Sequence, residues 1–269
     1  MEINIQNPFK RPCMFKVNIK TPQKMLIGVA VYSAKCRDTF YTYSKTWVDG
    51  SRVIDIRLPL CPKDGVISIW NASVKDKRNR DKGFKIGGIK KVPFTANLDV
   101  YETSNKTLKS FIKFAKEFAE CKNYLSTHSD EGKNRSIYKS DDGRFVIHYV
   151  DEIIGDDGKP RKTSMRVNNH NGVMELAKKY VKEYTIPETI AILLHEFSHF
   201  YLNEVHSDEF EADHNALLIY CGLGFPRQEG ARAFCKVFYR TPSDFNMARW
   251  KELKEFVEKF DRTNFKIVK

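Results

Sequence analysis

The chain has 269 residues, of which 41% are apolar and 13% aromatic, so it can bury a hydrophobic core in each of two domains. No stretch approaches the ~20 apolar residues of a membrane span, and the segment Met1–Asn7 lacks the basic-then-apolar order of a signal peptide. These features exclude a membrane-spanning helix and favour a cytoplasmic protein. Six cysteines are scattered without a Cys-x-x-Cys pair, which predicts reduced core residues rather than disulfides or a second zinc site.

Charge is distributed unevenly along the chain. Residues 1–100 carry 19 Lys and Arg against 8 Asp and Glu, whereas residues 101–269 carry 27 against 26. Nearly all of the net charge of +12 therefore belongs to the first segment. A basic surface attracts polyanions or an assembly partner. No nucleic-acid recognition motif accompanies the basic residues, so we expect a binding or assembly domain without base-specific recognition.

Residues 1–100 predict an all-β domain, either a sandwich or a barrel. Short runs of β-branched and aromatic residues alternate with turns rich in Pro, Gly and Asp, a spacing typical of both architectures. The charged stretch Lys75–Lys82 is interpreted as a solvated loop or as a contact for phosphate or another polyanion. The predicted strands are Met14–Ile19, Met25–Tyr32, Thr39–Tyr43, Val53–Leu58, Val66–Ala72 and Phe84–Ile89.

Residues 101–269 predict a second domain that mixes helices with a small sheet. Apolar residues at helical spacing from Leu108 to Leu125 indicate a helix that starts near residue 103. The amphipathic stretch Ser243–Phe260 predicts a terminal helix that covers the core. The chain as a whole is therefore expected to be α+β, with a C-terminal helical part. The strands predicted between these helices are Ser136–Tyr138, Arg144–Val150 and Thr163–Val167.

Residues 195–199, with the sequence HEFSH, are the strongest chemical signal of the chain. Each helical residue advances ~100°, so His195 and His199 lie roughly 40° apart on one face, and both rings can reach one ion. Glu196 projects beside them, where it can deprotonate a water molecule at the metal instead of binding the metal. Apolar residues at helical spacing place this helix in a core. The motif predicts a hydrolytic zinc site.

A zinc hydrolase needs a third protein ligand as well as an open position. Residues 208–220 predict a second helix with Ser207 or Asp208 as its N-cap. If the two helices form an antiparallel hairpin, Glu209 in the first turn of the second meets His199 near the end of the first. Asp213 lies one turn beyond Glu209 and could accept a hydrogen bond from the distal ring nitrogen of a ligating histidine.

Other polar residues leave alternatives open. Glu211 is the first alternative for the third ligand, with Glu204 and His214 behind it. His206 lies one residue out of register with the third histidine of metzincins. It is interpreted as a loop histidine at the cleft that could bind the metal or contact the transition state. Arg249 is interpreted as a solvated helix charge, or as a group that contacts the substrate or the oxyanion.

Together these motifs resemble those of the gluzincins, zinc metallopeptidases whose ligands are the HExxH histidines and a glutamate within Glu-x-x-x-Asp. Residues 209–213, EFEAD, are similar to the Glu-x-x-Ala-Asp segment of the CAAX prenyl protease and heat-shock protease group, the M48 family. They resemble more loosely the ImmA/IrrE-type group, M78. The interval from His199 to Glu209 is shorter than in M48 enzymes, and their transmembrane helices are absent. The resemblance, over roughly residues 105–260, therefore points to a minimal soluble relative.

The resemblance implies a zincin-like metallopeptidase domain over residues 101–269 that hydrolyses a protein or peptide substrate with Zn²⁺ as cofactor. The substrate is expected to pair with the edge strand Thr163–Val167, since backbone pairing binds a peptide with little sequence demand. Asn169 and its neighbours follow this strand and could line the cleft. The implied roles are zinc ligands for His195, His199 and Glu209, general base for Glu196, and orientation of a ligand for Asp213.

A second resemblance is to structural proteins of tailed bacteriophages. A basic β-domain joined to a compact metallopeptidase-like core implies a virion component of a tail or connector ring. In that case the enzyme fold is a building block with weak or no activity, because a fold does not guarantee catalysis. Hydrolysis by the metal-loaded protein favours the enzyme, and metal without hydrolysis in a stable ring favours the virion component.

Overall fold

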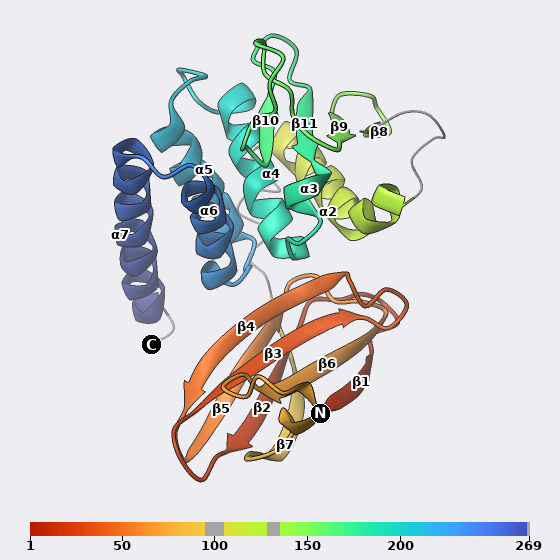
Figure 1. The fold of residues 1–269 in the computed structure, drawn as a ribbon, viewed down its shortest axis with the longest axis vertical. Helices are drawn as coiled ribbons and strands as arrows, with labels where there is room; N and C mark the ends of the chain where they lie inside the picture. Colours follow the sequence, from red (N-terminus) through yellow and green to blue (C-terminus); the bar gives the residue numbers. More distant parts are fainter. Residues whose placement is uncertain (95–104, 128–134, 268–269) are drawn as a thin grey trace. The chain divides into compact units, whose positions relative to one another are not determined.

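The structure is a computed structural model that describes residues 1–94, 105–127 and 135–267 (Figure 1). The chain divides into two compact units, Met1–Asn97 with Leu223–Phe225, and Leu98–Gly222 with Pro226–Lys269. The domain boundary predicted near residue 100 lies outside the described residues. The first unit holds strands β1 to β7 and the second holds α2 to α7 with β8 to β11, so the predicted α+β class is confirmed.

The first unit consists of two antiparallel sheets, with strand orders β1-β6-β3-β4 and β5-β2-β7 (Figure 1). Apolar residues such as Val17, Ile27 and Ile67 alternate into the core with no exposed surface. Of the two predicted architectures the unit forms the sandwich, because its strands close no barrel. The strands are β1 (Glu2–Gln6), β2 (Cys13–Lys20), β3 (Met25–Ser33), β4 (Phe40–Val48), β5 (Ser51–Leu58), β6 (Asp64–Asn71) and β7 (Lys85–Pro93).

The six predicted strands of this unit are present, and the differences lie at edges. β1 was not predicted, because a five-residue strand with mostly polar, exposed residues has little hydrophobic pattern; its pairing with β6 defines it. β4 continues to Val48, beyond the predicted end at Tyr43, because its pairing with β3 continues through residues with exposed side chains. Lys75–Lys82 contains the short 3-10 helix η1 (Lys77–Asn79).

The second unit packs helices against a four-stranded sheet of order β10-β11-β9-β8. β11 runs parallel to β9, and β10 lies at the edge. α4 packs against α2, α5, α6 and β10 (Figure 1). The Phe197 ring of α4 stacks on the Phe111 ring of α2, with centroids 4.4 Å apart. The elements are α2 (Lys106–Thr127), β8 (Arg135–Lys139), β9 (Val146–Val150), β10 (Met165–Val167), β11 (Met174–Ala177), α3 (Lys178–Val181), α4 (Ile186–Tyr201), α5 (Glu209–Gly222), α6 (Arg227–Arg240) and α7 (Asp244–Ile267).

A buried lysine, Lys122, donates hydrogen bonds to the segment that precedes α4. Lys122 of α2 has 1% of its surface exposed, and its Nζ donates to the carbonyl oxygens of Val181 at 2.6 Å and Tyr184 at 2.7 Å. These carbonyls lie at the end of α3 and just before α4, and the Val181 carbonyl also accepts the backbone N–H of Tyr184 at 3.0 Å. Burial lowers the pKa of Lys122 to about 7. The lysine therefore ties α2 to the start of the motif helix.

The six cysteines are free. Cys13 and Cys61 are buried, as predicted, and their sulfur atoms lie 3.5 Å apart. Cys36 and Cys235 are exposed, so the expectation that all six are core residues is wrong for these two. In the described part of the chain, no helix is both long enough and apolar enough to span a membrane.

Candidate metal centre

The motif helix α4 begins with a complete capping box. The Thr185 side chain accepts from the backbone N–H of Glu188 at 3.2 Å, and Glu188 accepts from the backbone N–H of Thr185 at 2.8 Å. Glu188 is fully buried, and its charge is paired with Arg232 at 2.5 Å and Lys236 at 2.9 Å, both on α6. These contacts fix the first turn of α4, three turns before the histidine pair.

A tight connection returns the chain from α4 to α5. Asn203 is buried, and its Nδ2 donates to the Asp208 carbonyl at 2.8 Å, while Asn215 Nδ2 donates to Asn203 Oδ1 at 3.2 Å. Asp208 Oδ1 accepts from the backbone N–H of Glu211 at 2.9 Å, so Asp208, one of the two predicted N-caps, caps α5. The predicted helical hairpin therefore forms, and Glu209 enters the first turn of α5 beside the histidines.

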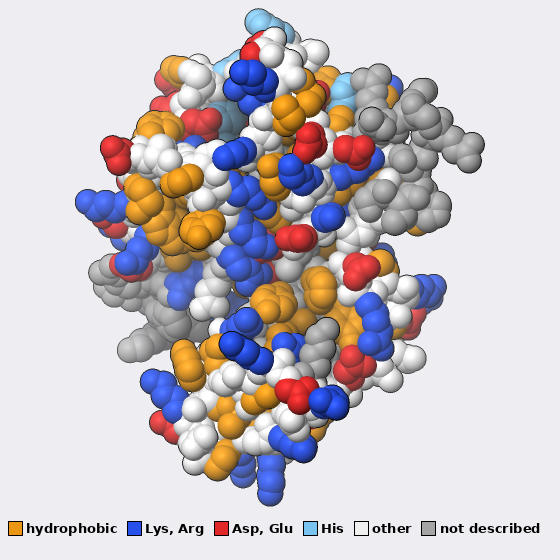
Figure 2. All heavy atoms as spheres, viewed as in Figure 1, with side chains coloured by type: hydrophobic (Ala, Val, Ile, Leu, Met, Phe, Trp, Pro, Cys, Tyr) orange, Lys and Arg blue, Asp and Glu red, His pale blue; other side chains and the backbone are white. Residues whose placement is uncertain are grey.

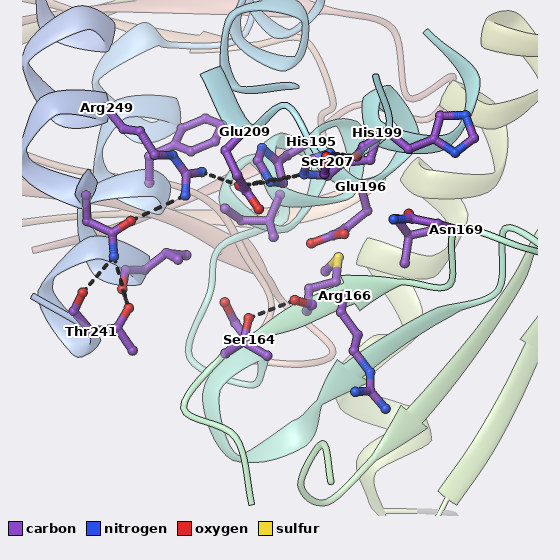
Figure 3. Close-up of a pocket in the computed structure, with 18 residues that line it drawn as sticks. Ser164, Arg166, Asn169, His195, Glu196, His199, Ser207, Glu209, Thr241 and Arg249 are labelled. Carbon is purple, nitrogen blue, oxygen red and sulfur yellow. Dashed lines mark hydrogen bonds and ion pairs between the residues drawn. The ribbon is translucent and has the colours of Figure 1, made fainter. Parts of the chain in front are cut away.

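Three donor atoms converge between the two helices (Figure 3). The Nε2 atoms of His195 and His199 lie 3.0 Å apart, and Glu209 Oε2 lies 3.3 Å and 3.6 Å from them. Ligand atoms about 2.0–2.1 Å from a tetrahedral zinc ion stand about 3.3 Å from one another. The three donor atoms are thus spaced as one ion requires, and the group could hold a metal ion.

Each histidine is oriented through its other ring nitrogen. His199 Nδ1 lies 2.7 Å from the backbone carbonyl of His206, which can only accept, so Nδ1 carries the proton. His195 Nδ1 lies 2.9 Å from Asp213 Oδ1, an ion-pair distance whose geometry is not that of the predicted hydrogen bond. When a shared cation is bound, both protons lie on Nδ1 and the two Nε2 atoms are available to coordinate it.

Arg249 of α7 joins the carboxylates behind the histidines. Its Nε and Nη2 lie 2.7 Å and 2.9 Å from the two oxygens of Asp213, and Nη2 lies 2.8 Å from Glu209 Oε2. Arg249 is 7% exposed, so the interpretation as a solvated helix charge is wrong. The sequence could have indicated this burial, because Arg249 lies four residues before Leu253 and therefore on the same, buried face of α7.

The site concentrates negative charge in a buried setting. Burial lowers the pKa of His195, but the carboxylates of Asp213 and Glu209 outweigh burial and raise that pKa to about 10. Burial raises the pKa of Glu209, but the histidines and Arg249 hold it well below its usual range. Three carboxyl groups, those of Glu196, Glu209 and Asp213, thus lie close to the two imidazoles and to one guanidinium, that of Arg249. A cation held by the three donor atoms would add a counter-charge to these carboxyl groups.

Glu196 faces the substrate side of the site. Its buried carboxylate points into the space between the histidines and β10, and burial raises its pKa (Figure 3). The cavity there has a volume of about 380 Å³, and Asn169 lies on its wall. β10 is an edge strand that is hydrogen-bonded to β11, as the sequence predicts for the end of Thr163–Val167.

The remaining sequence candidates lie around this centre without joining its donor group. His206 lines the cavity and contributes its backbone carbonyl to His199. Of the alternative third ligands, His214 Nδ1 contacts the Phe210 carbonyl at 2.8 Å, and Glu204 is exposed. Glu211 contributes a backbone N–H to the cap of α5. Among the described residues, the group that could hold a metal consists of His195, His199 and Glu209.

No family model, no curated protein and no solved structure matches the chain. The gluzincin resemblance therefore stays a prediction that rests on the two motifs, and the case for function rests on the geometry of the site.

Proposed function

We propose that the chain is a zinc-dependent metallopeptidase. The observation that carries the proposal is the convergence of His195 Nε2, His199 Nε2 and Glu209 Oε2 within 3.0–3.6 Å of one another, with Glu196 beside them. Two imidazole nitrogens and one carboxylate oxygen form the donor set of catalytic zinc sites that keep one position open.

The residues divide the chemistry between them. A zinc ion, when bound, supplies a Lewis acid toward a substrate carbonyl and a water molecule. Glu196 takes a proton from the water and delivers it to the leaving amine, and its raised pKa favours this transfer. Arg249 and Asp213 hold Glu209 and His195 in place.

The cavity beside the centre fits an extended peptide. β10 leaves one edge without a partner strand in its sheet, and Met165, Arg166 and Val167 all line the cavity. A peptide that adds to this edge gains backbone hydrogen bonds. Ile192, Phe234 and Val237 form an apolar wall of the same cavity, which suits an apolar substrate side chain.

Metal analysis together with hydrolysis tests the proposal. We expect one zinc per wild-type chain, loss of zinc in both His199→Ala and Glu209→Ala, and cleavage of casein by the wild type alone. Glu211→Ala is the matched control, because it removes a neighbouring carboxylate outside the donor group and should retain zinc. Zinc in the Glu209→Ala variant at wild-type level would refute the ligand assignment.

The alternative expectation, a virion component of a tail or connector ring, predicts a different result. Zinc at full occupancy with no cleavage of any peptide, in a protein that assembles into a stable ring, would support it over the enzyme.

A further inference from the structure

The outward face of the β5-β2-β7 sheet carries a concentration of positive charge. Side chains alternate across a strand, so the exposed residues of β2 and their cross-strand neighbours share this face. Its cations, all exposed, are Lys16 and Lys20 on β2, Arg57 on β5, and Lys85 and Lys90 on β7. Among the described residues, one carboxylate pairs with them, that of Asp55, 3.9 Å from Lys16 Nζ.

The register places like charges directly opposite each other. Lys16 pairs with Lys90, and Lys20 pairs with Lys85, across the β2–β7 ladder. Like charges at directly opposite positions destabilise a sheet, and two such pairs on one face add their costs. Internal stability therefore does not account for this arrangement, whereas a bound polyanion would turn the repulsion into attraction.

Between the two lysine pairs the face is open. Asn18 lies between Lys16 and Lys20 on β2, opposite Gly88 of β7. A side-chain carbon at Gly88 would meet no atom within 4 Å, whereas one at Gly87 would lie 3.1 Å from Asn18 Nδ2. An anionic group can therefore approach the backbone at Gly88, beside the side-chain amide of Asn18.

We propose that this face binds the phosphate backbone of a double-stranded nucleic acid without reading its sequence. Lysine binds phosphate as a point charge, and four of the five cations are lysines. Base reading requires side chains that reach base edges in a groove, and a flat sheet face provides contact with the backbone only. The duplex is thus held by charge, and its affinity depends on salt.

The composition of the face favours a duplex over the other polyanions. Single-strand binding uses aromatic side chains on which bases stack, and no aromatic residue of β2, β5 or β7 lies on this outward face. On the strand unit, Figure 2 shows hydrophobic side chains between the cations of the other sheet, where Trp47 is 53% exposed. Protein interfaces are depleted in lysine, so a face with four lysines is not typical of a protein-binding surface. Membrane-surface elements carry large apolar anchors, and the exposed apolar residue of this face is Val53.

Binding of a fluorescent 20-base-pair duplex to the full chain, measured by anisotropy at several salt concentrations, tests the proposal. We expect equal affinity for unrelated sequences and a slope of log affinity against log salt of about −0.9 for each phosphate contact. The variant Lys20→Gln/Lys85→Gln should bind about tenfold more weakly at 0.1 M salt and reduce the magnitude of the slope by about 2.

Matched variants and competing ligands make the result decisive. Lys24→Gln/Lys45→Gln removes the same charge from two exposed positions outside this face, one just before β3 and one on β4, and should keep wild-type affinity within about twofold. Equal losses in both double variants, or no loss in the first, would overturn the proposal. So would face-dependent binding of phosphatidylserine vesicles or polyglutamate without duplex binding. The substituted lysines are exposed, so a far-ultraviolet circular dichroism spectrum should show a folded chain in every variant.

Discussion

The metal centre and the basic sheet face differ in how their charged side chains are placed: those of the centre pair with opposite charges inside the protein, and those of the sheet face are exposed beside like charges. In the centre, Asp213 and Arg249 are buried and Glu209 is half-buried, and each lies within 3 Å of a group of opposite charge. On the sheet face, Lys16 and Lys90 are exposed and lie opposite each other. A buried charge needs a partner inside the protein, because no water solvates it. An exposed charge is solvated, so its partner can lie outside the protein.

This difference predicts how substitutions at the two regions will behave. Changes in the buried centre should cost catalysis or folding stability outright, since they leave an uncompensated group behind. Changes on the sheet face should leave folding intact or improve it. The expected effects fall in size from the reacting carboxylate to the surface lysines.

Glu196→Gln should have the largest effect. The amide cannot accept and deliver the proton, so we expect peptide hydrolysis to fall by about 10²–10⁴-fold. Zinc content should stay at the wild-type level, because Glu196 is not one of the three converging donors. Metal analysis and hydrolysis of the same preparation check both points. Full activity in this variant would exclude Glu196 as the base.

Arg249→Met should destabilise the fold by about 3–5 kcal/mol, because it leaves Asp213 and Glu209 without their buried counter-charge. Urea unfolding measures the loss. Arg57→Met on the sheet face is the matched control, since its exposed guanidinium should be worth less than about 0.5 kcal/mol. Equal losses in the two variants would remove the contrast between buried and exposed charge.

Lys122→Met should destabilise the fold by about 1–3 kcal/mol at pH 9, because it removes two buried hydrogen bonds, those from Lys122 Nζ to the carbonyls of Val181 and Tyr184. The effect should depend on pH. The folded chain holds the pKa of Lys122 at about 7 against an ordinary 10.5, so the unfolded chain binds more protons between these values. Lys122 thus makes the wild type more stable as pH rises through this window.

Urea unfolding of the wild type and of Lys122→Met at pH 7 and pH 9 shows whether their difference in stability grows or shrinks with pH. The stability of the wild type relative to Lys122→Met should be greater at pH 9. A difference that shrinks as pH rises would contradict the lowered pKa.

Lys90→Gln should have the smallest effect and the opposite sign. It removes one like-charge pair from the β2–β7 ladder, so we expect the free energy of unfolding at low salt to rise by about 0.2–1 kcal/mol. Thermal unfolding measures this change. The gain should decline in 1 M salt, where charge is screened. Lys35→Gln, an exposed lysine outside the strands, is the control and should change stability less.

Local spacing predicts the parts of this protein that depend on neighbours in the chain. The four-residue interval of His195 and His199 sets both on one face of α4 wherever that helix lies. The motif segment 209–213 needs only a short hairpin to return Glu209 and Asp213 to the histidines. The strands of the first unit are predicted in the same way, because a two-residue period signals a half-buried strand directly.

Weak local patterns account for the elements that sequence reasoning missed. β11 is followed at once by α3, and its four residues carry no strand period of their own, so pairing with β9 defines it. α6 has a mixed polar sequence and becomes the source of Arg232 and Lys236, which pair with Glu188. These contacts span more than forty residues, and no local signal encodes them.

By itself the sequence determined the two-part α+β organisation, the motif helix and the three residues of the donor group. Tertiary structure alone decided that Arg249, 36 residues beyond Asp213, completes the centre, and that two pairs of lysines meet across the β2–β7 ladder. The physical reason is the separation along the chain between the residues that interact. Helical and strand periods act over a few residues, whereas ion pairs and strand register depend on which distant segments the fold brings together.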